Sequence, residues 1–366
     1  MEKNTLALIV AIILIAVAIV ALSSLSPNRT YTGTAVTPGN RTAINAEKAQ
    51  IYPYAKEIAE PSGFINVDNI TIGSLIGKDV ILVDFWTYSC INCERTIPYL
   101  NLWYQKYHDE GLEIIGVHTP EFQFEHDINN VRMAVQKFGI QYPVVLDNNY
   151  ATWDSYGNQY WPEDYLIDID GFIVYHHIGE GDYNETEQEI QKLLVERSEA
   201  LDLNISVSNT TSVPGNAVAI NYSGIGSPET YFGSARNQYL ANGNPSVSGP
   251  QTLVLPAEIQ LNELYLGGTW NFADQYAENT GNASIVFQYN AKNVYFVASA
   301  DNATDVQVLL DGKPITDNAG ADVRNSVVTV QADQLYSIVQ GSDYSTHTLE
   351  LDVPDPGLRA YTFTFG

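Results

Sequence analysis

The segment Val80-Ile-Leu-Val-Asp-Phe-Trp-Thr-Tyr-Ser-Cys-Ile-Asn-Cys93 decides how the rest of the chain is interpreted. Its first seven residues form the nearly continuous apolar run that is typical of a central strand buried on both faces. After Cys90, apolar residues recur at helical spacing, at Ile97, Leu100, Trp103 and Tyr107. A helix that begins beside the cysteines offers free N–H groups and a positive dipole end, which favour a thiolate at the first cysteine.

Cys90 and Cys93 are the only cysteines of the 366 residues. Their spacing places the second thiol one helical turn after the first, close enough to form a disulfide after a nucleophilic attack. A purely structural disulfide is one alternative. Half of a zinc site is another, but the sequence has no second cysteine pair and no His-x₃₋₅-His. The strand–turn–helix context favours redox chemistry.

Outward from this segment, residues 60–202 alternate between strand and helix patterns and predict an α/β layer fold. Asp170-Gly171 between two apolar runs predicts a hairpin. The other elements that we expect are strands at 112–117 and 144–146 and helices at 128–138 and 190–201.

The pattern changes near residue 203. Residues 203–215 are polar and predict a linker, and residues 216–366 carry short β-rich runs between Gly, Pro, Asn and Asp. Two of these runs are 284–289 and 294–298. Regular short strands with turn residues between them indicate an all-β sandwich.

Residues 1–23 contain an uncharged apolar run from Leu6 to Leu22, and residues 24–59 predict a tether. At about 1.5 Å per residue the run just spans a hydrocarbon core of roughly 30 Å. Its length favours one uncleaved transmembrane helix, although Ala21-Leu22-Ser23 also resembles a signal-peptide cleavage site. Either interpretation predicts that the rest of the chain is exported, and the uncleaved helix would also anchor it to the membrane.

The chain has 17 basic and 43 acidic residues and a net charge of −26. Such a surface repels phosphate backbones, which excludes nucleic-acid binding. Nine Asn-x-Ser/Thr sequons agree with export, although chance in a chain rich in Asn, Ser and Thr is an equal alternative. Their acceptors are Asn28, Asn40, Asn69, Asn184, Asn204, Asn209, Asn221, Asn282 and Asn302.

The segment Asp84–Cys93, with Pro98 five residues later, resembles the thioredoxin active site. Four further segments resemble the extracytoplasmic region of DipZ-type proteins, in the TlpA-like branch of thioredoxins. They are Gly116-Val-His-Thr-Pro-Glu-Phe122, Gln141-Tyr-Pro-Val-Val-Leu-Asp147, Tyr160-Trp-Pro-Glu-Asp-Tyr-Leu-Ile-Asp168 and His176-His-Ile-Gly-Glu-Gly181. Ser227–Gly233, Leu266–Trp270 and Asp355–Gly366 resemble the final domain of that group, described as carbohydrate-binding-module-like.

The resemblance implies a role for several residues. Cys90 matches the exposed nucleophile and Cys93 the buried resolving thiol. Asp84 matches the buried acid that exchanges a proton with Cys93, and Pro162 matches the cis-proline that faces the disulfide. The resemblance implies no metal and no cofactor besides the redox-active Cys90–Cys93 disulfide.

A substrate groove is expected around the cysteines. We place Trp86, Tyr88, His118, Glu121 and Trp161 in it, because they lie within the matched segments. A core position is an equal alternative for Trp86, and solvated positions without a function are the alternative for His118 and Glu121. The substrates implied by the resemblance are protein disulfides.

Two departures from the family pattern bear on function. Ile91-Asn92 replaces the usual Gly-Pro between the cysteines, so the reduction potential of thioredoxin does not transfer to this chain. DipZ-type proteins also carry their own electron-transporting membrane domain, whereas this sequence has one long apolar segment. A reductase of this kind therefore requires electrons from a separate multi-helix membrane protein of the CcdA type.

The β-rich domain suggests two further hypotheses. Aromatic residues, chiefly Tyr231 and Trp270, are candidates for a glycan-binding platform, because sugar rings stack on π surfaces. The alternative is a structural or docking role, since aromatic residues of a β-sandwich are more often buried in its core. Asp311, Asp317 and Asp322 are candidates for calcium ligands, although their spacing follows no known pattern. Two alternatives to a reductase remain. One is an oxidase of folding proteins, which would use the same cysteine pair in the opposite direction. The other is a glycan-binding surface protein whose thioredoxin-like domain is a scaffold.

Overall fold

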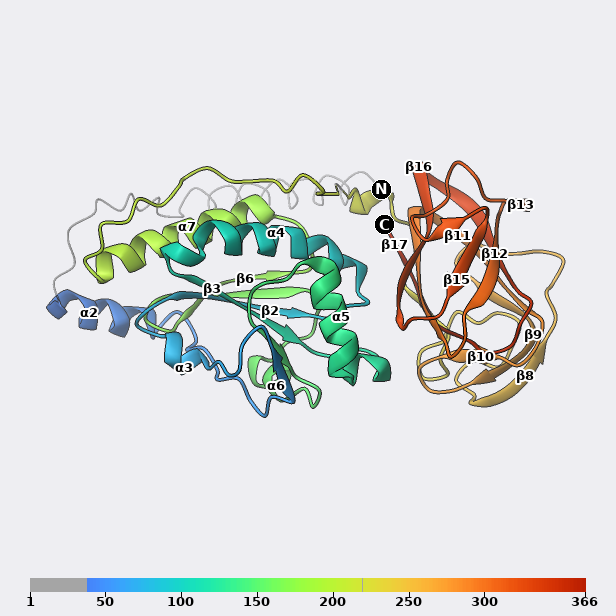
Figure 1. Cartoon of the computed structure of the whole chain (residues 1–366), viewed down its shortest axis with the longest axis horizontal. Coiled ribbons are helices and arrows are strands. Elements are labelled where there is room, and N and C mark those ends of the chain that lie inside the picture. The colour runs from blue at the N-terminus through green and yellow to red at the C-terminus, as the bar shows by residue number, and fades with distance from the viewer. Residues whose placement is uncertain (1–37, 219) are drawn as a thin grey trace, which may run out of the picture. The chain divides into compact units, whose positions relative to one another are not determined.

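A computed structural model describes residues 38–218 and 220–366 of the chain (Figure 1). The apolar segment at residues 1–23, with its anchor and signal-peptide interpretations, lies outside the described residues. Within the described residues, no helix combines the length and the hydrophobicity that a membrane span requires.

The first folded part follows the helix α2 (Pro38–Lys48) and is built from alternating strands and helices. The strands are β1 (Gly63–Ile65), β2 (Val80–Trp86), β3 (Leu112–His118), β4 (Val144–Leu146), β5 (Glu163–Ile167) and β6 (Ile173–Ile178). The α-helices are α3 (Ile72–Leu75), α4 (Ile91–Tyr107), α5 (Ile128–Phe138), α6 (Ala151–Tyr156) and α7 (Tyr183–Ala200), and 3₁₀ turns span His108–Glu110 and Gln123–His126.

These strands form one mixed sheet in the order β1-β4-β3-β2-β5-β6. Strands β2, β3 and β4 are parallel, and β5 and β6 form the hairpin that Asp170-Gly171 predicted. This is a thioredoxin-like α/β fold with β2 near the centre of the sheet, as the apolar run from Val80 predicted.

Both faces of the sheet are covered by helices (Figure 1). Residues Val80, Leu82 and Trp86 of β2 pack into the core under α4, α5 and α7, and Ile81, Val83 and Phe85 pack into the core under α3 and α6. Side chains of a strand alternate between faces, so Asp84 belongs to the α4 face. The acid is therefore placed under the helix that carries the cysteines.

The second folded part is a single antiparallel β-structure with its own core. Its strands are β7 (Thr230–Tyr231), β8 (Gly249–Leu253), β9 (Leu264–Phe272), β10 (Ala277–Asn279), β11 (Ala283–Ala300), β12 (Thr304–Leu310), β13 (Lys313–Pro314), β14 (Val323–Arg324), β15 (Val327–Val330), β16 (Gln334–Val353) and β17 (Leu358–Phe365). A 3₁₀ turn at Tyr222–Gly224 precedes them. The all-β prediction is confirmed for this part.

Strand β11 corrects one expectation. The runs 284–289 and 294–298 were expected to be two strands, but one long strand contains both. The polar interruption at Lys292 coincides with a shift of the pairing register between Ala291 and Asn293, which is a bulge instead of a turn.

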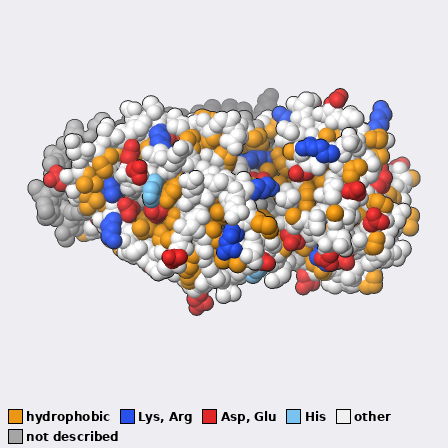
Figure 2. All heavy atoms as spheres, in the orientation of Figure 1, with side chains coloured by type: hydrophobic (Ala, Val, Ile, Leu, Met, Phe, Trp, Pro, Cys, Tyr) orange, Lys and Arg blue, Asp and Glu red, His pale blue; other side chains and the backbone are white. Residues whose placement is uncertain are grey.

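Surface charge is distributed over the visible face (Figure 2). Acidic and basic side chains alternate there with neutral and hydrophobic ones.

Candidate functional site

The two cysteines lie where β2 passes into α4. Cys90 is the N-cap residue of α4, with extended backbone angles (φ −89°, ψ 117°), and its side chain makes no capping hydrogen bond. Cys90 is half-buried and Cys93, one turn later, is 1% exposed. Both thiols are free. One sulfur is thus open to a partner, and the other is enclosed behind it.

The segment before β5 closes one side of Cys90. The Cys90 thiol donates to the Trp161 carbonyl at 3.8 Å, and the Trp161–Pro162 peptide bond is cis. The Trp161 indole Nε1 donates to the Thr119 carbonyl at 3.1 Å. Trp161 is half-buried beside the nucleophile, so its side chain can contact a substrate held at Cys90.

Burial governs the chemistry of Cys93. Enclosure in the core raises the pKa of the Cys93 thiol well above its usual value, and the nearby Cys90 and Asp84 raise it further. A buried thiol of this kind stays protonated unless a base takes its proton. Cys93 therefore needs a proton acceptor before it can act as a nucleophile.

Asp84 is the carboxyl group whose charge acts on this thiol. It is 1% exposed, and burial, followed by the charge of Asp164, raises its pKa well above the usual range. On its other side Asp84 pairs with Gly116 of β3. A Cβ at Gly116 would lie 2.9 Å from the Trp86 indole nitrogen and 3.1 Å from the Tyr142 ring, so a glycine is required there.

Three residues assigned to the groove lie below it instead. Trp86 and His118 are 0% exposed, and Tyr88 is 4% exposed. The His118 ring stacks on Tyr88 at 5.7 Å, and burial lowers its pKa to about 3. The groove position of Tyr88 and His118 is wrong, and Trp86 takes its alternative, a core position, because β2, the turn after it and β3 direct these side chains into the core under α4. They support the site from beneath and cannot line a groove.

Glu121 is partly exposed but already has partners. Its Oε1 accepts from the Arg236 guanidinium at 2.7 Å and from the Tyr231 hydroxyl at 2.9 Å. Both donors belong to the β-rich part of the chain. Glu121 therefore joins the two folded parts, beside the apolar cluster in which Ile91 packs with Tyr361.

Glu125, a fully buried acid beside the nucleophile, was not among the residues predicted from the sequence. Its Oε1 accepts from the Ser89 hydroxyl at 2.7 Å, and its Oε2 accepts from the backbone N–H groups of Glu121 and Phe122 at 2.6 and 2.8 Å. Burial raises its pKa to about 7. The carboxylate fixes the turn that precedes Cys90, and no spacing rule in the sequence indicates such a contact.

We expect Glu125→Ala to lower the stability of the protein by about 2–4 kcal/mol, because it leaves the part-buried N–H of Glu121 and the buried N–H of Phe122 without acceptors. Glu125→Gln keeps one acceptor oxygen and should cost less. Chemical denaturation of both variants measures the difference. Equal stability of Glu125→Ala and the unmodified protein would contradict this role.

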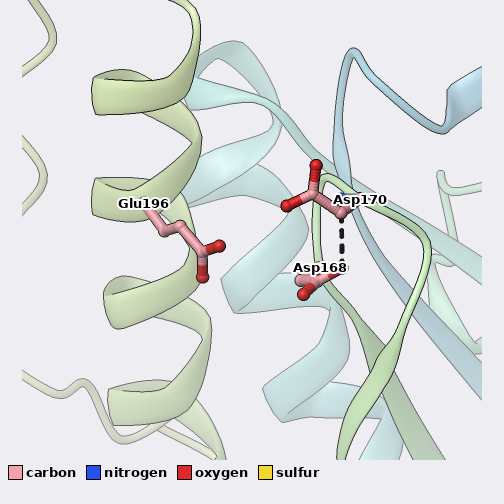
Figure 3. Close-up of side chains that lie close together, drawn as sticks. All are labelled: Asp168, Asp170 and Glu196. Atoms are coloured by element: carbon pink, nitrogen blue, oxygen red, sulfur yellow. Dashed lines mark hydrogen bonds between the residues drawn. The ribbon is translucent and has the colours of Figure 1, made fainter. Parts of the chain in front are cut away.

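Asp168, Asp170 and Glu196 form the one cluster of three metal-capable side chains found among the described residues (Figure 3). Glu196 projects from α7 toward the β5–β6 turn, where the Asp170 N–H donates to Asp168 at 3.0 Å. The Lys48 ammonium lies 2.6 Å from Asp168 and 3.4 Å from Asp170, and it also pairs with Glu196. A single lysine therefore pairs with all three carboxylates, and we assign the cluster to an ion-pair network.

Two of the three candidate calcium ligands, Asp311 and Asp322, already have partners within the protein. Asp311 accepts from the Thr348 N–H at 2.9 Å and pairs with His347 at 2.7 Å, while Asp322 accepts from the Ser337 N–H at 2.7 Å. Asp311, Asp317 and Asp322 are not brought together as a cluster in the part of the chain that the structure covers.

The proposed glycan platform is also corrected. Trp270 is 0% exposed in the β-rich core, and its indole donates to the Gly267 carbonyl at 2.9 Å, so no sugar ring can reach it. The Tyr231 ring is covered by the Arg236 guanidinium at 3.7 Å. The platform was predicted from residue type alone, and packing in a β-structure buried its largest member.

The sequons fall into two groups. Asn28 and the side chain of Asn40 lie outside what the structure describes. The acceptor asparagines that are described are all exposed, namely Asn69, Asn184, Asn204, Asn209, Asn221, Asn282 and Asn302.

Comparisons with known proteins follow the two folded parts. Residues 66–194 match the Redoxin family, and residues 227–366 match the family described as Thioredoxin like C-terminal domain. Protein DipZ of Mycobacterium bovis and of Mycobacterium tuberculosis is 38% identical over 316 residues, which is 85% of this chain and 43% of DipZ. The chain thus spans less than half the length of these relatives.

Two further matches cover smaller shares of this chain. Thiol-disulfide oxidoreductase YkuV of Bacillus subtilis is 28% identical over 127 residues, which is 35% of this chain and 85% of YkuV. The solution structure of a putative thioredoxin from Neisseria meningitidis is 26% identical and covers 40% of this chain and 92% of its own, with a TM-score of 0.35.

Proposed function

We propose that the chain is a thioredoxin-like thiol–disulfide oxidoreductase that reduces protein disulfides outside the cytoplasm, and its similarity to DipZ and to the Redoxin family supports this. One observation carries the proposal. The half-buried Cys90 begins α4, while Cys93 is enclosed one turn later on the same face as Asp84. This arrangement separates a nucleophile that meets the substrate from a thiol that acts only afterwards.

The reaction follows from that separation. The Cys90 thiolate attacks one sulfur of a substrate disulfide, the substrate S–S bond breaks, and the first substrate thiolate leaves and is protonated. Asp84 takes the proton of Cys93, whose thiolate then attacks the Cys90 sulfur. The mixed disulfide breaks, the second substrate thiol is released, and a Cys90–Cys93 disulfide remains. Two electrons pass to the substrate, and the two thiols carry them without another cofactor.

Regeneration of the dithiol requires an electron donor. We propose that a separate multi-helix membrane protein of the CcdA type supplies these electrons, and that the apolar segment at residues 1–23 holds the chain at the membrane. The exposed sequon asparagines are compatible with an extracytoplasmic location.

The direction of electron flow is tested by the reduction potential of the Cys90–Cys93 pair. We expect a value more negative than about −180 mV, the potential of protein disulfide isomerase, because a reductase must donate electrons to its substrates. Equilibration with glutathione, followed by alkylation and mass analysis, measures it. A potential near about −120 mV, the value of a strong oxidant, would contradict the reductase and favour the oxidase of folding proteins.

A further inference from the structure

Three titratable side chains lie in one row across the sheet. Asp84 of β2 is directly opposite Asp164 of β5, and Asp164 is directly opposite His177 of β6. Directly opposite residues of antiparallel strands point to the same face, with Cβ atoms about 4.5–5.5 Å apart. That face is the one under α4, because Leu82 and Leu166 pack there two residues away from the acids on the same strands.

The row is polar but enclosed. Both carboxylate oxygens of Asp84, Oδ1 of Asp164 and Nε2 of His177 are shielded from solvent and have no hydrogen-bond partner outside the row, within which the two acids contact each other. Buried polar atoms are nearly always hydrogen-bonded, so a chain of exceptions in one line suggests a role other than stability. The row begins at Asp84, whose charge acts on Cys93, and ends on β6, the last strand of the sheet, where His177 is half-buried.

We propose that Asp164 and His177 form a relay that carries the Cys93 proton from Asp84 to the edge of the sheet and returns it in the opposite step. The proposal rests on the proposed function, in which Asp84 accepts that proton. An imidazole is suited to the outer position because it can take a proton at one nitrogen and release another from the second.

The charges around the row favour one shared proton between the acids. Burial raises the pKa of both carboxyl groups, the charge of Asp164 raises the pKa of Asp84 further, and the contact with Asp84 lowers the pKa of Asp164. Asp84 is therefore the acid that holds the proton more tightly.

The groups packed around this pair are neutral or acidic, so none of them would stabilise a second negative charge. They are Cys93 of α4, Tyr142 before β4, Glu163 of β5 and Tyr175 of β6. The charges of Asp182 and Glu185, at the start of α7, act on Tyr175.

Proton balance is complete in both directions. When Cys93 becomes a thiolate and forms the disulfide with Cys90, its proton moves to Asp84, while the proton already held by the pair moves to His177 and then to water. When a donor reduces the disulfide, a proton enters by the same residues and returns to Cys93. Asp164 and His177 act through Asp84 and not on the sulfurs, so they are positioning residues.

The test measures both phases of a single turnover in rapid mixing of the reduced full chain with a disulfide-bonded peptide. The first phase is mixed-disulfide formation at Cys90, and the second is its resolution by Cys93. We expect Asp164→Asn and His177→Gln to leave the first phase unchanged and to slow the second about 10-fold at pH 7, less than the roughly 10²–10⁴-fold that loss of a direct proton acceptor costs. Added imidazole should restore the rate of His177→Gln, and Asp164→Glu should retain most of the rate.

His176 provides a matched control on the same strand. It pairs with Tyr165, faces the opposite side of the sheet and is exposed, with Glu163 at 3.4 Å. His176→Gln should resolve the mixed disulfide at the unmodified rate and with the unmodified pH profile.

The possible outcomes distinguish failure of the proton relay from failure of the proposed disulfide-exchange function. Resolution at the unmodified rate and pH profile in folded Asp164→Asn and His177→Gln, with Asp84→Asn slow, would overturn the relay alone. Equal slowing of the His176 control, or no restoration by imidazole, would also overturn it. Absence of the first phase in every protein would overturn the proposed function.

Discussion

Asp84→Asn should slow the resolution of the mixed disulfide by about 10²–10⁴-fold, the usual contribution of a positioned proton acceptor. Cys93 is 1% exposed, and its raised pKa keeps it protonated near neutrality. The amide introduced at this position could not accept the proton, so the thiolate would form only rarely. The formation of the mixed disulfide at Cys90 should not change. Rapid mixing with acid quench and mass analysis follows both phases.

The fold of this variant should remain intact, because a neutral amide replaces an acid whose charged form burial already disfavours. Asp79→Asn is a suitable control, since Asp79 lies one residue before the same strand and pairs with Arg197 of α7. Unchanged resolution in Asp84→Asn across pH 5–9 (roughly the range over which His, Cys and the raised carboxyl groups titrate) would remove Asp84 from the mechanism.

Asp164→Asn should stabilise the protein at alkaline pH by on the order of a few kcal/mol. Asp164 is 4% exposed, and burial raises its pKa from 3.8 to about 7. Between these two values the folded protein holds a proton that the unfolded chain has released, so the stability of the unmodified protein falls as pH rises. Above about pH 7 the full loss is present, whereas below pH 3.8 it is absent.

The sign of this effect is therefore specific. The variant should match the unmodified protein at a pH near the ordinary carboxyl pKa of 3.8 and exceed it increasingly up to about pH 7, with a constant advantage above that. Urea unfolding over this range, followed by tryptophan fluorescence, provides the measurement. A variant that is less stable above this range, or equally stable at every pH, would show that Asp164 does not hold its proton in the fold.

The strands near the cysteines could be predicted because a short run of neighbouring residues in the sequence indicates that they are buried. The run from Val80 to Trp86 is apolar on both faces, and the structure places alternate residues in two separate cores. The same alternation placed Asp84 beneath α4. Cys90 and Cys93 follow from the strand–turn–helix context, which fixes one thiol at the helix start and the other in its first turn.

Other features depend on contacts between residues distant in sequence. Asp164 lies opposite Asp84 only because β5 pairs with β2 in one register, and a shift of one residue would send it to the other face. The Glu125–Ser89 bond likewise spans 36 residues. His118 and Trp270 have the residue types of binding sites, yet packing buries both, and residue type gives no measure of burial.

The most direct test of the account replaces Cys93 by serine and follows the covalent adducts of Cys90. Serine nearly preserves the size of the side chain but cannot attack the mixed disulfide, so the adduct should persist until a reductant is added. Cys90→Ser, in which the remaining thiol is 1% exposed, should form no adduct with a protein disulfide. We therefore predict a reductant-sensitive adduct in Cys93→Ser that mass spectrometry locates at Cys90. If Cys93→Ser forms no such adduct while Cys90 still reacts with iodoacetamide, the pair does not exchange disulfides and the account is contradicted.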